Sequence, residues 1–216
     1  MMERKSSAGW RETWEGLRYA RYVIFHPFKG FWDLKKERRG NLRSAALLLA
    51  GLILMLTVRR QFTGFAINDN DPLSMNLLLQ ITYVLLPFIL WCAANWAITT
   101  LVDGEGTFSD IFITTAYALT PVILLNMPMV IMSNDLVLEE MPFYYLLDTV
   151  SVIWAGFLIV VGIMTVHQFT MPKTIGTMII AVVGMAAILV LFLLFFTMLQ
   201  QMFNFAKIAY FELFRR

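Results

Sequence analysis

Five long apolar segments constrain the fold of this chain more than any other feature of its sequence. A helix needs about 20 apolar residues to cross the hydrocarbon core of a bilayer, and inside that core every backbone polar group must be paired within the protein. None of the segments alternates polar and apolar residues as a strand would. We therefore predict five transmembrane helices, at Leu42–Val58, Leu77–Leu101, Ile111–Met132, Leu146–Val166 and Thr174–Leu199.

The composition supports the same class. Hydrophobic residues make up 59% of the chain and charged residues 15%, whereas soluble domains are about a quarter charged and just under half apolar. A chain with so little polar surface must expose part of its surface to lipid. The predicted fold class is all-α, a polytopic helical membrane protein.

The N-terminal segment, residues 1–41, differs from the rest because it is basic and carries more than half of the 17 Lys and Arg residues. Residues 8–25 form an amphipathic pattern that includes Trp10 and Trp14. This pattern fits a helix lying along the membrane and equally a helix packed on the protein's own surface. His26-Pro27 then ends this helix, and Pro27 begins a second one that Gly40 is placed to end.

These patterns divide the chain into a basic interfacial segment (1–41), a five-helix transmembrane domain (42–199) and a helical tail (200–216). The basic cluster beside the first span places the N-terminus in the cytoplasm, so we expect a multi-pass protein of the cell membrane. Five spans then put the tail outside; if one segment is re-entrant, the tail is cytoplasmic. A basic run in this position is a topology anchor, and we expect no nucleic-acid binding.

Ionisable and amide side chains inside spans are candidate functional groups. The predicted spans contain very few, and the two we single out are Asn95 and Asp148. Asp148 lies near the start of the fourth span. We consider three alternative roles for it: it caps the helix, it faces a water-filled vestibule, or it carries a proton or ion. His167, at the other end of that span, is too far along the helix to touch Asp148.

No pattern in the chain indicates catalysis. There is no HExxH, CxxC or phosphate-binding glycine loop, and the single cysteine, Cys92, lies in an apolar run. The turn Asp103-Gly-Glu-Gly106 lacks the lysine and serine of a phosphate loop, and its acidic residues repel phosphate. We predict a protein that is not an enzyme, with no catalytic residue, no metal site and no bound cofactor.

The same turn joins the second and third spans as a short hairpin closed by Gly104 and Gly106, and Ser109 is placed to cap the next helix. It precedes the run Ala116-Tyr-Ala-Leu-Thr-Pro121, and His26-Pro27 precedes the first span. With five spans, this pattern resembles bacterial members of the Yip-domain family. The residues that carry the resemblance are His26, Pro27, Asp103, Gly104, Gly106, Tyr117 and Pro121.

The resemblance implies a non-catalytic membrane scaffold. Bacterial members often accompany transport systems, sugar ABC importers in particular, so an ABC transporter permease is the implied partner besides the lipid bilayer. Eukaryotic relatives bind Rab/Ypt GTPases, but their Asp-Leu-Tyr-Gly-Pro motif before the spans is absent here, and GTPase binding is not carried over.

Two functions from different classes remain. The first is a scaffold or accessory subunit that binds another membrane protein through its spans and N-terminal helices. The second is a small transporter or channel with a polar cavity near Asn95 and Asp148. Substituting Asp148 by Asn separates them, because only the second function predicts loss of solute flux with intact assembly.

Overall fold

A computed structural model describes residues 2–65, 67–68 and 75–214, and within these residues the chain is helical with no strand. The α-helices are α1 (Met2–Phe25), α2 (Pro27–Lys36), α3 (Leu42–Phe62), α4 (Leu77–Leu101), α5 (Phe108–Ala118), α6 (Thr120–Met132), α7 (Met141–His167) and α8 (Met171–Phe214). A short 3-10 turn, η2 (Leu138–Glu140), precedes α7.

Five helical segments are long and apolar enough to cross a membrane, which confirms the predicted number of spans. The third span consists of α5 and α6 together, with a break at Leu119. The fourth span begins earlier than predicted because Pro142 starts the helix before the fully apolar run. Asp148 therefore lies about two turns inside α7 rather than one.

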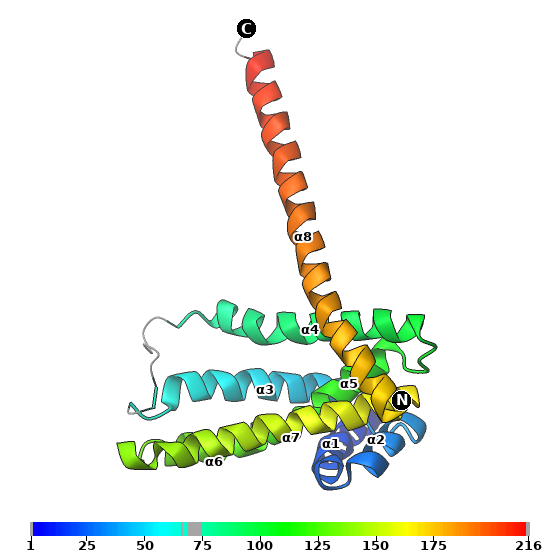
Figure 1. The fold of residues 1–216 in the computed structure, drawn as a ribbon, viewed down its shortest axis with the longest axis vertical. Helices are drawn as coiled ribbons and strands as arrows, with labels where there is room; N and C mark the ends of the chain where they lie inside the picture. Colours follow the sequence, from blue (N-terminus) through cyan, green and yellow to red (C-terminus); the bar gives the residue numbers. More distant parts are fainter. Residues whose placement is uncertain (1, 66, 69–74, 215–216) are drawn as a thin grey trace.

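The core of the bundle is made by α3, α5, α6 and α7, and α4 packs beside α3 and α5. In Figure 1 the helices α3, α4, α6 and α7 run side by side. Leu48 and Leu52 of α3, Tyr117 of α5 and Leu158 and Val161 of α7 are buried in one cluster. Many large apolar side chains on the outer surfaces of α4 and α7 stay exposed, as lipid-facing side chains do.

The last helix, α8, is arranged differently. It packs on α4 through its first turns, where Ala181 is buried and Gly184 faces Ala94. It then crosses the bundle at a steep angle and continues away from it (Figure 1). The predicted tail, residues 200–216, is a continuation of α8 as far as Phe214 rather than a separate element.

The two N-terminal helices pack on one end of the bundle, which we call the N-terminal end. There α1 contacts α3 and α2 contacts α7. The buried face of α1 combines the small residues Gly16 and Ala20, which allow close approach of two helices, with Val23 and Ile24. The helix therefore packs on the protein's own surface. Trp10 and Trp14 point away from the bundle and are 70% and 67% exposed.

The predicted end of the second helix at Gly40 is wrong. α2 ends at Lys36, and the left-handed residue that follows is Arg38, with φ of 52°. Gly40 instead allows the segment after α2 to pack closely against Tyr117, because a Cβ on Gly40 would lie 3.2 Å from the hydroxyl oxygen of Tyr117.

Candidate functional site

Tyr117 is fully buried where three helices meet. Its hydroxyl donates to the carbonyl of Gly16 in α1, with an oxygen–oxygen distance of 3.0 Å, and lies 2.8 Å from Ser44 Oγ in α3. Each of the two hydroxyls has one proton to give, and Ser44 Oγ also lies 2.8 Å from the carbonyl of Asn41, so the hydroxyls and the two carbonyls form one connected network. Tyr117 thus ties the N-terminal helix to two transmembrane helices.

Pro121 breaks the third span just after this tyrosine. Proline has no N–H for the carbonyl four residues earlier, which here belongs to Tyr117. The hydroxyl of Thr120 donates to that carbonyl at 2.7 Å and so replaces the missing bond. The run Tyr-Ala-Leu-Thr-Pro therefore produces a kink whose polar groups are paired, and it holds no reactive group.

The acidic turn after α4 begins with Asp103, which has a φ of 55°. Asp tolerates this left-handed conformation better than most residues. The conformation allows the Gly104 N–H to donate to the carbonyl of Thr99 at 2.8 Å, and this bond ends α4. The next helix is capped by Thr107, which exchanges bonds with Asp110. The predicted cap, Ser109, is wrong by two positions, because Ser109 already lies inside α5.

Both glycines of the turn lie against His167 at the end of α7. Gly106 N–H donates to His167 Nδ1 at 3.2 Å. A Cβ on Gly104 would lie 2.5 Å from His167 Nδ1, and one on Gly106 would lie 2.6 Å from His167 Cε1. Neither glycine has a positive φ, so their role is close packing. The sequence pattern alone did not pair this turn with His167.

Lys35 of α2 joins the same end of the bundle. Its ammonium donates to the carbonyl of Val166, in the last turn of α7, and lies 3.7 Å from the carboxylate of Glu105. A cation at a helix C-terminus is favourable because the last carbonyls carry partial negative charge.

The other two motif residues shape the start of α2. Pro27 occupies its first turn, as predicted, and His26 is the N-cap residue without a side-chain cap. The His26 ring stacks on Tyr22, with 4.7 Å between ring centroids. His26 and Pro27 therefore have a structural role at the junction of α1 and α2.

Asp148 is paired with Arg59, at the end of the bundle opposite to α1 and α2, which we call the far end. Arg59 Nη1 and Nη2 donate to the two carboxylate oxygens at 2.6 and 2.9 Å, and Arg59 Nη1 also bonds Asn126 Oδ1 at 2.8 Å. The Arg59 guanidinium lies over Tyr144 at 5.7 Å from the ring centroid. Sequence reasoning identified Asp148 but not its partner, although an arginine at the end of a span was a signal.

Asn95 lies elsewhere. It is fully buried in α4, one turn from Thr99, and neither its Nδ2 nor its Oδ1 has a hydrogen-bond partner among the described residues. Because Thr99 adjoins the turn at the N-terminal end and Asp148 lies at the far end, the structure does not bring Asn95 and Asp148 together.

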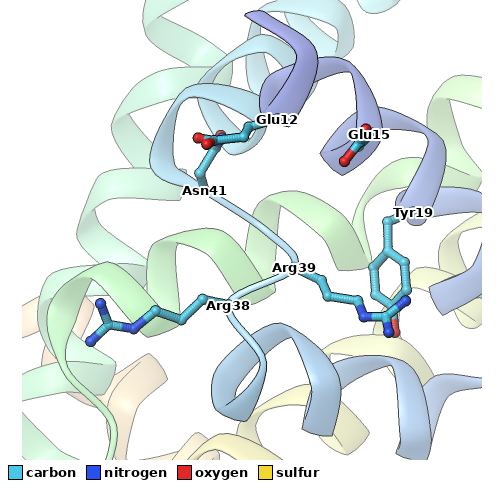
Figure 2. Close-up of a pocket in the computed structure, with 6 residues that line it drawn as sticks. All are labelled: Glu12, Glu15, Tyr19, Arg38, Arg39 and Asn41. Atoms are coloured by element: carbon cyan, nitrogen blue, oxygen red, sulfur yellow. The ribbon is translucent and has the colours of Figure 1, made fainter. Parts of the chain in front are cut away.

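A pocket of about 430 Å³ lies between α1 and the segment that follows α2 (Figure 2). Its lining residues carry charges of both signs: Glu12, Glu15, Tyr19, Arg38, Arg39 and Asn41.

Tyr19 of this pocket donates to Asp33 Oδ2 at 3.0 Å. Burial and this bond to a carboxylate raise the pKa of Tyr19 above its usual value. Arg39 already pairs with Glu37 at 2.6 Å. Two of the pocket's polar side chains, Tyr19 and Arg39, are therefore already paired with acidic residues of the same protein.

Among the described residues, no group of three or more His, Cys, Asp or Glu side chains is placed to hold a metal ion. Cys92 is buried as a free thiol. Among the motif residues, Tyr117 and Gly106 form bonds that join one helix to another.

The sequence signature of the Yip1 domain matches residues 21–209 of the chain. No match was found among curated proteins or among solved structures. The matched region covers α2 to α7, nearly all of α8 and the last turn of α1.

Proposed function

Because the chain belongs to the Yip1 domain family, we propose that it is a non-catalytic scaffold or accessory subunit that binds another integral membrane protein. The candidate complex is a bacterial ABC-type carbohydrate importer, with its permease as the partner. In this proposal the protein lies in the cell membrane with its N-terminal helices in the cytoplasm.

The observation that carries the proposal is the surface of α8. Within Met171–Glu212 the most apolar 18-residue window has a mean hydropathy of 3.1, and only 6% of that window is buried. At about 1.5 Å per residue the whole segment is roughly 60 Å long, about twice the hydrocarbon thickness of a bilayer. Lipid covers one such thickness, but Phe203, Phe205 and Phe211, which follow the most apolar run, are exposed as well and need another apolar surface.

A helix lying flat on the bilayer is a poor alternative for α8. Such helices have one polar face, and residues 175–199 have none, since they are almost entirely Ile, Leu, Val, Met, Ala and Phe. A second membrane protein offers the apolar surface that the excess length requires.

The polar groups of the bundle favour the same function. Tyr117, Thr120 and Gly106 bond neighbouring backbone or side chains within the chain. Asp148 is neutralised by Arg59. These side chains position helices against one another, which suits a rigid scaffold and supplies no group for chemistry.

The transporter alternative has less support. It needs Asn95 and Asp148 to share one path, but they lie at opposite ends of the bundle, and Asp148 is already ion-paired. The Asp148→Asn variant tests it in reconstituted vesicles. Loss of solute flux in a variant that still folds would favour transport over the scaffold.

Extraction in a mild detergent tests the scaffold directly. We expect the chain to elute with one other integral membrane protein in a fixed ratio. Replacing the exposed Phe195 and Phe196 of α8 by Ala should release that partner, whereas replacing the equally exposed Leu78 and Leu79 of α4 should not. A single-component, monodisperse preparation would count against the scaffold.

A further inference from the structure

Two adjacent arginines end α3 at the far end of the bundle, but only one of them is neutralised. Arg59 is held by both carboxylate oxygens of Asp148. Arg60 Nη1 donates to Gln80 Oε1, a neutral acceptor, at 3.1 Å. Among the described residues no carboxylate pairs with Arg60, and its Nε is buried without a hydrogen-bond partner. The positive charge of Arg60 is therefore not compensated by a carboxylate of the described residues.

Arg60 lines a pocket of about 400 Å³ between α3, α4 and α7. The polar part of its wall includes Arg59, Arg60, Thr63, Asn68 and Gln80. The apolar part includes Leu56 and Val84, one turn deeper along α3 and α4. A pocket with a cationic rim and an apolar lower wall fits a ligand with an anionic head and a hydrocarbon tail.

The position of the pocket along the spans agrees with such a ligand. It opens where α3 ends and where α4 and α7 begin. Tyr83 and Tyr145 line it and are 68% and 50% exposed. Tyrosine is enriched at the level of the lipid headgroups, so the pocket lies at the boundary between hydrocarbon and water.

We propose that this pocket binds the phosphate of a phospholipid headgroup at Arg60. Gln80 engages Nη1 and Nε is buried, so Nη2 is the guanidinium nitrogen that donates to a phosphate oxygen, in a charge-assisted bond. The tyrosine hydroxyls donate to the remaining headgroup oxygens, and the acyl chains lie along Leu56 and Val84. This site is independent of the partner-binding function proposed for α8.

Native mass spectrometry of the full chain, released from nanodiscs of mixed phosphatidylglycerol and phosphatidylcholine, tests the site. We expect the protein to retain one phospholipid and the Arg60→Gln variant to retain it at least about five-fold less often. Arg60→Lys keeps the charge but loses the planar fork, so it should be intermediate. Arg11→Gln, which removes the same charge from an exposed position on α1, should behave as the unchanged protein.

Competition with inorganic phosphate distinguishes a phospholipid headgroup from the free phosphate ion as the ligand. At millimolar concentration it should not displace the retained lipid, because it lacks the apolar tail; full displacement would mean a site for the free ion and would overturn the lipid assignment. Equal retention by Arg60→Gln and Arg11→Gln would overturn the site itself. If Arg60→Gln does not fold, Tyr83→Leu and Val84→Asn probe the same pocket, and unchanged retention in both has the same meaning.

Discussion

The hydroxyl of Tyr117 donates to the carbonyl of Gly16, 3.0 Å away, and so joins a transmembrane helix to the N-terminal helix across 101 positions of the sequence. This contact gives the buried tyrosine of the motif a structural role. The tyrosine sets the position of α1 relative to the membrane bundle.

Replacing Tyr117 by Phe should free α1. The variant removes the buried bonds of the hydroxyl to Ser44 and to the Gly16 carbonyl, which stays paired within α1, and each such bond contributes about 0.5–1.5 kcal/mol. We expect that loss in the free energy of unfolding, together with faster proteolysis within α1. Denaturation in detergent and limited trypsin digestion measure the two effects. Tyr83→Phe, at a position 68% exposed, is the control, and equal behaviour of the two variants would contradict the role of Tyr117.

Gly106→Ala should damage the hairpin between α4 and α5. The new Cβ would lie 2.6 Å from His167 Cε1, and overpacking of this kind costs about 1–3 kcal/mol. A Cβ on Gly156 of α7 would meet nothing within 4 Å, so Gly156→Ala should be neutral or slightly stabilising. Thermal unfolding measures both variants. Adding His167→Ala to Gly106→Ala should recover part of the loss; no recovery would mean that the ring is not the obstacle.

Asp148→Asn should destabilise the far end of the bundle. It leaves Arg59 without a counter-charge in a setting where the two side chains are only 28% and 24% exposed, and we expect a cost of about 1–3 kcal/mol. The double variant Arg59→Met with Asp148→Leu should be more stable than Asp148→Asn, because apolar residues replace buried ion pairs well. Chemical denaturation of these two variants and the unchanged protein gives the comparison, and a double variant no more stable than Asp148→Asn would contradict the pairing.

Alkaline pH should loosen the N-terminal helices. Burial and the bond to Asp33 raise the pKa of Tyr19 in the folded protein, so folding favours the neutral phenol. That contribution is complete below the unfolded pKa of about 10 and is lost as the pH rises above it. Stability measured between pH 8 and pH 11 should therefore fall less steeply in Tyr19→Phe than in the unchanged protein. Parallel curves would show that Tyr19 does not contribute.

The spans themselves were predictable because long apolar runs leave few alternatives to a membrane helix. Their partners were not, since a span that is apolar on all sides gives no period that marks its inner face. Arg59 and Asp148 lie 89 positions apart, and nothing in the local pattern joins them. The same limitation hid the pairing of Gly106 with His167.

The N-terminal helix shows a second limit. Its tryptophans mark an amphipathic face, but they are exposed, and the buried side combines the small Gly16 and Ala20 with Val23 and Ile24. Close helix packing uses small residues, and a search for large apolar residues overlooks them. The turn, in contrast, was correctly interpreted as a hairpin between two helices on the basis of its residue types, although its cap is Thr107 and not Ser109.

Site-specific photo-cross-linking on α8 tests the scaffold most directly. A photoreactive amino acid replaces Phe203, which is 73% exposed on α8, and in a matched variant it replaces Leu78, which is 75% exposed on α4. Irradiation of intact cells should join Phe203, but not Leu78, to one other integral membrane protein. Adducts with lipid alone, with a second copy of the chain, or equally from both positions would contradict the proposed scaffold.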